Sequence, residues 1–211
     1  MLSVAEARAA ILARARPLPS EQTDLDAALT RTLREAVVSP RAQPPFDASA
    51  MDGYAVRSGD TPGRLRVIGE AGAGHGLDRR LGPGECARIF TGAPMPEGAD
   101  AVLIQEDAEQ RDDVVIAPAV EVRRHVRAAA VDFPAGAVLL SPGIALGAAG
   151  IALSAASGQA SLRVGRRPRI AILSGGDEIV APGSAPSPHQ IFDSVSYGIA
   201  GLARSWGGQA V

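Results

Sequence analysis

Two acidic segments contain the residue types that bind hard metal ions. The first holds Asp47 and Asp52, and the second holds Asp177 and Glu178, with Asp193 further along the chain. Clustered carboxylates on loops suit Mg²⁺, which takes oxygen ligands and usually keeps water or bridges a phosphate. Aspartates beside glycine are also common in turns and caps, where they accept hydrogen bonds from the backbone. The presence of two such segments weakens this simpler explanation without removing it.

A third segment places a hydroxyl beside glycine amides. It runs from Thr91 to Asp100 and follows a strand-like run. Such a loop could hold an oxyanion, although a tight turn also explains its glycines and prolines. The glycine-rich segment 72–76 lacks lysine and no strong helix pattern follows it, so we interpret it as a flexible hairpin tip rather than a phosphate loop. The histidines and the single cysteine, Cys86, show no zinc spacing, and no Ser-His-Asp nucleophile elbow is present.

The first elements expected around these residues are helices. Ser3 and Glu6 have the spacing of a capping box and open an apolar helical stripe that Pro17 ends. A second helix is expected over residues 24–35, where leucines and alanines recur on one side. Prolines then stop regular structure before residues 46–56, which we interpret as a shaped loop entering a strand.

Short β-prone runs follow, separated by glycine and proline. They cover residues 65–68, 86–90, 101–104 and 114–116. This pattern predicts a small β domain or barrel. Residues 118–164 then return to helix and turn character.

The last part of the sequence predicts the beginning of an α/β domain. Residues 170–173 form an apolar run of the parallel-strand type that empties into the glycine-rich, acidic turn 174–178. In open α/β sheets, ligands bind at the carboxyl ends of the strands. A helix is expected over residues 194–206 and another strand begins at 210–211, which is too little to make a doubly wound sheet. We therefore expect this domain to be cut short, with the chain either a fragment or completed by a partner. The expected fold class is therefore a multidomain α/β protein.

The composition argues against several classes of function. The 21 basic and 23 acidic residues give a net charge of -2, and the arginines are spread along the chain, so no nucleic-acid partner is expected. One cysteine forms no intrachain disulfide and suits the cytoplasm, and the first twenty residues lack the apolar core of a secretory signal. Residues 133–162 carry no charge, but glycines and prolines break them, so we expect a buried turn and helix rather than a membrane span.

Three long motifs resemble those of the molybdopterin molybdenumtransferase family, which includes MoeA and the gephyrin E-domain. They are residues 44–56 (PPFDASAMDGYAV), 88–102 (RIFTGAPMPEGADAV), and 172–178 (ILSGGDE) with 190–196 (QIFDSVS). The motifs occur in the family's order. The resemblance covers nearly all 211 residues, which correspond to the N-terminal half of a full-length member.

The resemblance implies a domain organisation. Residues 1–43 and 117–165 would form a discontinuous helical and extended linker domain, and residues 44–116 a small β-barrel-like domain. Residues 166–211 would begin a doubly wound α/β molybdopterin-binding domain. The resemblance also implies an elongated homodimer, with molybdopterin adenylyltransferase and molybdoenzymes as further partners.

The resemblance also implies the reaction and its residues. Members insert molybdenum from molybdate into adenylylated molybdopterin and release AMP in a Mg²⁺-dependent step. By motif position, the catalytic residues are Asp52, Thr91, Asp132 and Asp177. The implied cofactor-binding residues are Ser174, Gly176, Asp177, Glu178, Asp193 and Ser194, and of these Asp177 and Glu178 would also hold the metal. In the family, the site lies between the small β domain of one subunit and the pterin-binding domain of the other.

This chain departs from the family pattern in an active-site segment. The family has several arginines followed by Gly-Glu-Asp, whereas residues 127–132 read Arg-Ala-Ala-Ala-Val-Asp, so Val131 stands where the glutamate is expected. The usual Ser-Thr-Gly-Asp-Glu is Ser-Gly-Gly-Asp-Glu at 174–178, and the Asn of Asp-Ser-Asn is Val195. Fewer arginines should weaken binding of an anionic substrate. We therefore expect this chain alone to have little or no insertion activity.

Two other functions remain open at this point. The departures favour a non-catalytic scaffold or chaperone that binds molybdopterin or a molybdoenzyme. An unrelated sugar- or nucleotide-binding α/β protein is supported only by the strand and turn over residues 170–178, and a likeness of fold does not assign function.

Overall fold

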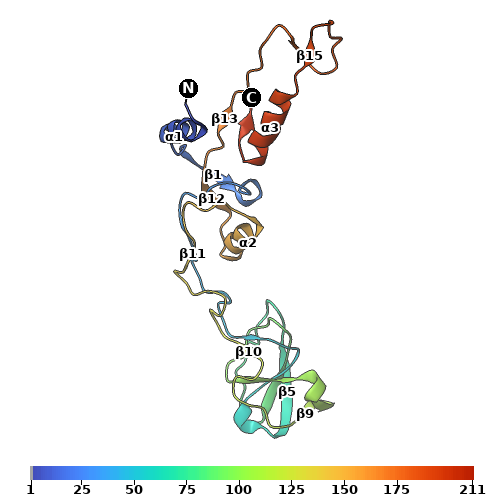
Figure 1. Ribbon diagram of the computed structural model, residues 1–211. Helices are drawn as coiled ribbons and strands as arrows, with labels where there is room; N and C mark the ends of the chain where they lie inside the picture. The colour runs from blue at the N-terminus through green and yellow to red at the C-terminus, as the bar shows by residue number, and fades with distance from the viewer. Residues whose placement is uncertain (1) are drawn as a thin grey trace. The chain divides into compact units, whose positions relative to one another are not determined.

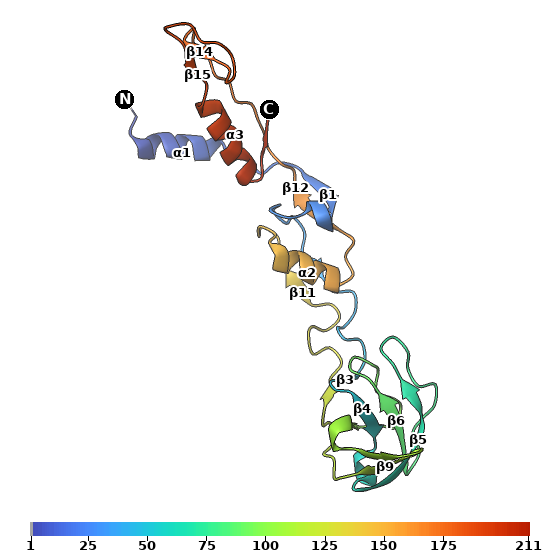
Figure 2. The same ribbon diagram turned by 90° about the vertical axis from the view of Figure 1, so that its right-hand side faces the viewer.

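The computed structural model describes residues 2–211, which divide into two compact units (Figures 1 and 2). The discontinuous unit consists of residues 2–38 and 138–211, and the inserted unit is Ser39–Ala137. Each unit has its own buried apolar core. The chain thus enters the inserted unit once and leaves it once.

The inserted unit is built on a curled six-stranded sheet with the strand order β7-β4-β6-β5-β9-β8. Its strands are β4 (Gly53–Val56), β5 (Gly63–Ala71), β6 (Glu85–Ile89), β7 (Ala101–Ile104), β8 (Glu109–Arg111) and β9 (Val114–Ala117). Pairing is antiparallel except between β5 and β6. A separate pair joins β3 (Ala48–Ser49) to β10 (Val126–Arg127). Two 3-10 turns, η2 (Ser58–Asp60) and η3 (Gln105–Asp107), complete the unit.

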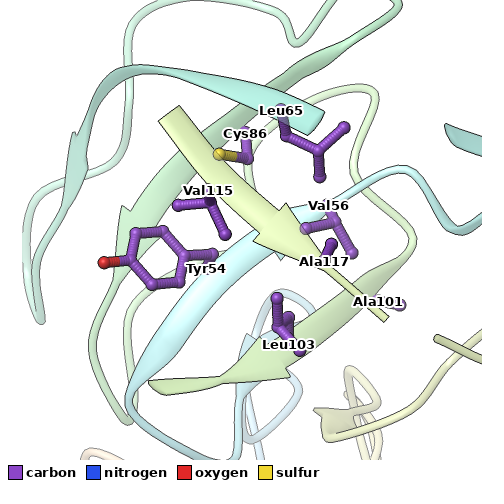
Figure 3. Close-up of a cluster of buried hydrophobic side chains, with 8 residues drawn as sticks. All are labelled: Tyr54, Val56, Leu65, Cys86, Ala101, Leu103, Val115 and Ala117. Atoms are coloured by element: carbon purple, nitrogen blue, oxygen red, sulfur yellow. The ribbon is translucent and has the colours of Figure 1, made fainter. Parts of the chain in front are cut away.

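Strand β4 is buried on both faces and lies in the middle of this core. Tyr54 and Val56 join a cluster on one face, drawn in Figure 3, while Ala55 joins a second cluster on the other face. The first cluster consists of Tyr54, Val56, Leu65, Cys86, Ala101, Leu103, Val115 and Ala117. Because side chains alternate along a strand, burying both faces fixes the register of β4. The loop that precedes β4 is fixed with it.

The discontinuous unit combines short strand pairs with three α-helices. The helices are α1 (Val4–Arg14), α2 (Ala148–Ala156) and α3 (Val195–Ser205). The antiparallel pairs are β1 (Ser20–Asp24) with β12 (Ser161–Gly165), and β2 (Val37–Val38) with β11 (Val138–Leu140). Their core includes Leu33, Val37, Leu146, Leu162 and Val164.

The C-terminal part of the discontinuous unit has parallel pairing. Strand β13 (Arg169–Ile170) pairs with β16 (Gln209–Ala210), and β14 (Ile179–Val180) pairs with β15 (Ile191–Phe192). Helix α3 leads from β15 back to β16, which is the strand-helix-strand order expected of an α/β domain. The expected α/β character of this segment is therefore present in the fold.

Most expected elements are confirmed, and two expectations are corrected. Helix α1 begins after the expected capping box, since the Glu6 amide donates to Ser3 Oγ and the Ser3 amide donates to the Glu6 carboxylate. The four expected strand runs correspond to β5, β6, β7 and β9. The segment 72–76 is a tight turn closed by a bridge between Gly72 and His75, as the hairpin interpretation requires.

The helix expected over residues 24–35 is wrong. Only one 3-10 turn forms there, η1 (Leu25–Ala27), and the backbone beyond it bonds to distant segments. The amide of Thr30 donates to the carbonyl of Leu146, and that of Leu33 donates to Ile144. These tertiary bonds replace the helical ones, so the spacing of apolar residues here reflects burial rather than a helix.

The helix and turn character expected over residues 118–164 is only partly present. Helix α2 forms within it, but β10, β11 and β12 are extended. No helix among residues 2–211 is long and apolar enough to cross a bilayer.

We predict that Gly53→Ala destabilises the inserted unit. A Cβ atom at this position would lie 2.0 Å from the Leu103 carbonyl oxygen of the neighbouring strand, so β4 and β7 would have to separate. The expected loss is about 1–3 kcal/mol in the free energy of unfolding, measured by urea denaturation. Gly59→Ala is the matched control, because a Cβ there meets nothing within 4 Å. Equal stability of the two variants would contradict the prediction.

Candidate functional site

The inserted unit has an open pocket of about 510 Å³ formed largely by two of the sequence motifs. Its lining residues are Arg41, Gln43, Pro44, Pro45, Phe46, Ala48, Ser49, Ala50, Thr91, Gly92, Arg127 and Asp132. The lining therefore brings together residues that are far apart in the sequence, including Thr91 and Asp132, which the motif positions single out. Hydroxyl, amide, guanidinium and carboxylate groups all line it. Such a mixture of apolar surface and a few polar groups is typical of ligand sites.

Asp52 does not line this pocket, but it holds Thr91, which does. One oxygen of Asp52, Oδ1, accepts from the Thr91 amide at 2.7 Å and from the Thr91 hydroxyl at 2.8 Å. These two bonds, with a smaller contribution from the charge of Arg88, lower the pKa of Asp52. Because the Thr91 hydroxyl uses its proton on Asp52, its oxygen is left as an acceptor toward the pocket.

Asp132 is paired with the arginine that survives in the altered segment. Its Oδ1 accepts from Arg127 Nη2 at 2.6 Å, and its amide donates to the Gln43 carbonyl at 3.0 Å. The neighbouring Val131 is 57% exposed, so the side chain that replaces the family's glutamate is not part of the core. The backbone at this point therefore has room for a longer polar side chain.

Asp47, the other acid of the first segment, has a structural role. It forms a salt bridge with Arg123, and its Oδ1 accepts from the Ala129 amide at 2.8 Å. The hydrogen bond from Arg123, followed by that from Ala129, lowers the pKa of Asp47. Asp47 thus ties the first motif to the segment that carries Arg127 and Asp132. This role is a tertiary one and not that of a local turn residue, because both partners lie more than 70 residues further along the chain.

One residue beside Thr91 did not emerge from the sequence. The guanidinium of Arg88 lies over the rings of Tyr54 and Phe90, with its Cζ atom 5.2 and 5.0 Å from the ring centroids. Its Nη2 also donates to Gln105 Oε1 at 2.6 Å. Arg88 lies in β6 and Phe90 follows its last residue, and this spacing of two residues along an extended backbone is a signal that could have pointed to the stack.

In the discontinuous unit, the structure brings Ser174 and Asp193 together. The pKa of Asp193 is lowered mainly by hydrogen bonds from the hydroxyl and amide of Ser196, and Ser174 contributes a further side-chain hydrogen bond. Asp193 therefore caps the start of α3. Ser194, its neighbour, forms no capping hydrogen bond through its side chain, so its hydroxyl is not used at the helix start.

The acidic turn itself is tight and exposed. The carboxylate of Glu178 folds back over Gly176, and a Cβ atom at Gly176 would lie 2.4 Å from Glu178 Oε2. Asp177 and Glu178 are both exposed. Among residues 2–211 no group of three or more His, Cys, Asp or Glu side chains is placed to hold a metal ion. The turn offers two adjacent carboxylates and no more.

The sequence-derived site residues thus fall into two groups, one in each unit. Thr91 and Asp132 line the pocket of the inserted unit, and Asp52 is hydrogen-bonded to Thr91. The remaining ones, Ser174, Gly176, Asp177, Glu178, Asp193 and Ser194, lie between β13 and the start of α3 in the discontinuous unit.

The contacts of Asp47 predict a pH-dependent contribution to stability. A carboxylate whose pKa is lower in the folded state stabilises the fold above its unfolded pKa, near 3.9, and this contribution is lost as pH falls through the lower folded pKa. We expect Asp47→Asn to lower the free energy of unfolding by about 1 kcal/mol at pH 7, with a smaller difference below about pH 4. Asp78→Asn, at an exposed site, is the control. A difference that stays constant between pH 3 and pH 7 would contradict this account.

Comparisons with known proteins agree with the motifs. A family model described as the MoeA N-terminal region (domain I and II) matches residues 2–158. The molybdopterin molybdenumtransferase of Nostoc sp. is 40% identical over 200 residues, which cover 91% of this chain and 46% of that protein. The Haemophilus influenzae enzyme of the same name is 34% identical, covering 92% and 49%. The chain therefore spans about half the length of the curated relatives it matches.

Solved structures give the same result. A molybdopterin biosynthesis MoeA protein from Pyrococcus horikoshii matches with a TM-score of 0.84 and 34% identity, covering all of this chain and 56% of that one. A second structure of a protein with this description, from the same organism, matches with a TM-score of 0.82 and 27% identity, covering 92% and 55%. With the family model, the motifs and the fold in agreement, this chain belongs to the MoeA family, of which it forms an N-terminal portion.

Proposed function

We propose that this chain is part of a molybdopterin molybdenumtransferase, which inserts molybdenum from molybdate into adenylylated molybdopterin and releases AMP. Its relatives carry that enzyme name, which supports a role in molybdenum cofactor biosynthesis. The observation that carries the proposal is the pair of hydrogen bonds by which Asp52 orients Thr91 beside the pocket. Both residues stand where the family motifs place their counterparts.

The pocket of the inserted unit would hold the anionic substrate. Arg41 lines it, and no acid within residues 2–211 forms a salt bridge with this arginine, so its positive charge is available to a phosphate or to molybdate. Thr91 would accept a hydrogen bond from the ligand through the lone pairs that Asp52 leaves free. Asp132, paired with Arg127, would supply negative charge at the other side of the lining.

The turn 174–178 and the start of α3 would hold the phosphate end of the pterin substrate. The hydroxyl of Ser194 lies at the start of α3 and makes no capping hydrogen bond, and the N-terminal end of the helix dipole favours an anion there. Ser174 would be oriented by its bond to Asp193. Residues 166–211 would accordingly be the start of the pterin-binding domain, next to a linker domain of 1–43 and 117–165 and a β domain of 44–116.

Asp177 and Glu178 would hold Mg²⁺. Two exposed, adjacent carboxylates fit Mg²⁺, because this ion keeps several water ligands and takes others from the substrate phosphate. They would not suffice for an ion whose ligands all come from the protein. The ion would neutralise charge on the phosphate as AMP leaves. In this proposal, Asp177 and Glu178 of the partner subunit face Asp52 and Thr91, so the working form is a homodimer.

The remaining expectations follow from the same proposal. The protein would work in the cytoplasm, with a molybdopterin adenylyltransferase upstream and molybdoenzymes downstream as partners.

A second candidate is a non-catalytic scaffold that binds molybdopterin without inserting metal. Ala128 and Ala129 favour it, because they stand where the family has arginines, close to Asp132. An active enzyme and a scaffold differ in one readout, the Mg²⁺-dependent release of AMP from adenylylated molybdopterin in the presence of molybdate. Binding of the substrate without AMP release would support the scaffold, and absence of binding would exclude both.

We predict that Thr91→Val lowers the rate of AMP release by the protein in its full natural length. Removing the hydroxyl deletes a charge-assisted bond to Asp52 and the acceptor that faces the pocket, which corresponds to a rate loss of about 10- to 100-fold. Thr23→Val, on strand β1 of the other unit, is the isosteric control and should keep the full rate. An unchanged rate for Thr91→Val would remove Thr91 from the site.

We predict the opposite effect for Val131→Glu. The side chain is exposed, so the substitution should change the free energy of unfolding by less than about 0.5 kcal/mol. If an acid at this position takes part in the reaction, AMP release should become several-fold faster or should begin. Val131→Gln separates charge from size, and a rate gain equal to that of the glutamate variant would contradict the acidic role.

A further inference from the structure

The discontinuous unit has a second pocket, of about 310 Å³, that is rich in arginine and takes no part in the proposed reaction. It is lined by Arg16, Pro17, Leu18, Thr30, Arg31, Thr32, Arg34, Gly165, Arg166, Arg167, Pro168, Trp206 and Gly207. None of these residues lines the pocket of the inserted unit or belongs to the segments 174–178 and 193–194. Five guanidinium groups therefore surround one open hollow.

Backbone carbonyls hold four of these arginines in place, and within residues 2–211 three of the four, Arg16, Arg34 and Arg167, form no salt bridge with an acid. Arg34 Nη2 donates to the Leu18 carbonyl at 2.9 Å, and Arg167 Nη1 donates to Gly207 at 3.1 Å. Arg16 Nη1 donates to two carbonyls at the end of α1, and buried Arg31 donates to Gly165. A guanidinium has five N–H donors, so each arginine keeps donors for a ligand.

Negative charge around the pocket is sparse. Within residues 2–211, Glu21 is the only acid in salt-bridge contact with any of the five arginines, and it is shared by Arg31 and Arg166. Its contact with Arg166 is long, 3.7 Å between Nε and Oε2. The pocket therefore carries unbalanced positive charge, which favours a ligand with several negative charges.

The wall also contains a large aromatic surface and two hydroxyl-bearing residues. Trp206 lines the pocket and is 79% exposed, and Thr30 and Thr32 lie on the same lining. An exposed indole offers a flat face for stacking with another ring, and such stacking is insensitive to the identity of the ring. Arginine forks match the oxygens of phosphate in pairs.

We propose that this pocket binds a small organic phosphate that carries a planar ring, with the phosphates against Arg34 and Arg166 and the ring against Trp206. The hollow is of small-molecule size, at the lower end of the range for ligand pockets. The site uses none of the residues assigned to the proposed reaction, so variants of its own lining residues separate it from nucleotide binding at the reaction site.

The test is binding of three probes to the protein at low ionic strength, measured by calorimetry. ADP carries both phosphates and a ring, pyrophosphate only the charge, and adenosine only the ring. We expect ADP to bind more tightly than pyrophosphate, and adenosine to bind weakly or not at all. Affinity for ADP should fall steeply as salt is raised, because exposed charges are screened.

Two variants and a control locate the binding. Arg34→Gln with Arg166→Gln should weaken ADP binding by about tenfold or more, and Trp206→Leu should reduce ADP affinity to that of pyrophosphate. Arg64→Gln, an exposed arginine of β5 in the inserted unit, should leave all affinities unchanged. A folded circular-dichroism spectrum is required of each variant.

Three results would overturn the proposal. They are the absence of ADP binding at millimolar concentration in low salt, ADP binding that survives the double arginine variant, and equal affinity for ADP and pyrophosphate in the unaltered protein. Either of the first two results would show that these arginines do not form a phosphate site. The third would show that the ring of the ligand contributes nothing to binding.

Discussion

The arrangement of the inserted unit depends on the close pairing of β4 with β7 at Gly53. The absence of a side chain at this position lets the two strands approach, and burial of β4 on both faces then fixes its register. Asp52 precedes Gly53 directly, so its carboxylate is placed by that register. Since Asp52 binds both the amide and the hydroxyl of Thr91, a backbone constraint in the core sets the position of a polar group at the pocket.

The sequence predicted the strands of this unit well and its tertiary bonds poorly. Residues 101–104, for example, are all aliphatic and lie between turns, a local pattern that predicts a strand. The structure forms β7 over these residues. The helix expected over 24–35 failed because its backbone bonds to residues more than a hundred positions away, such as Leu146. Local spacing carries no information on such partners.

In the candidate site, too, the sequence indicated the residues but not their tertiary partners. The motifs singled out Asp52 and Thr91, which are hydrogen-bonded in the fold, but no spacing rule reveals that Asp47 is held by Arg123, 76 residues further on. That bond gives Asp47 a structural role, although it is of the same residue type as Asp52 and lies in the same motif. The contact of the Arg88 guanidinium with the rings of Tyr54 and Phe90 was not predicted. The sequence shows only that Arg88 and Phe90 are two residues apart, whereas Tyr54 comes from the neighbouring strand β4.

The central claim is that Thr91 and its neighbours form the binding surface for adenylylated molybdopterin. The most direct measurement is a titration of the isotope-labelled protein with this compound, followed through the backbone amide resonances. The account predicts that Thr91, Gly92 and Arg127 shift together at the lowest ligand concentrations, while Gly74, on the turn of another loop of the same unit, does not move. Unchanged resonances of Thr91 and Gly92 at saturating ligand would contradict the account.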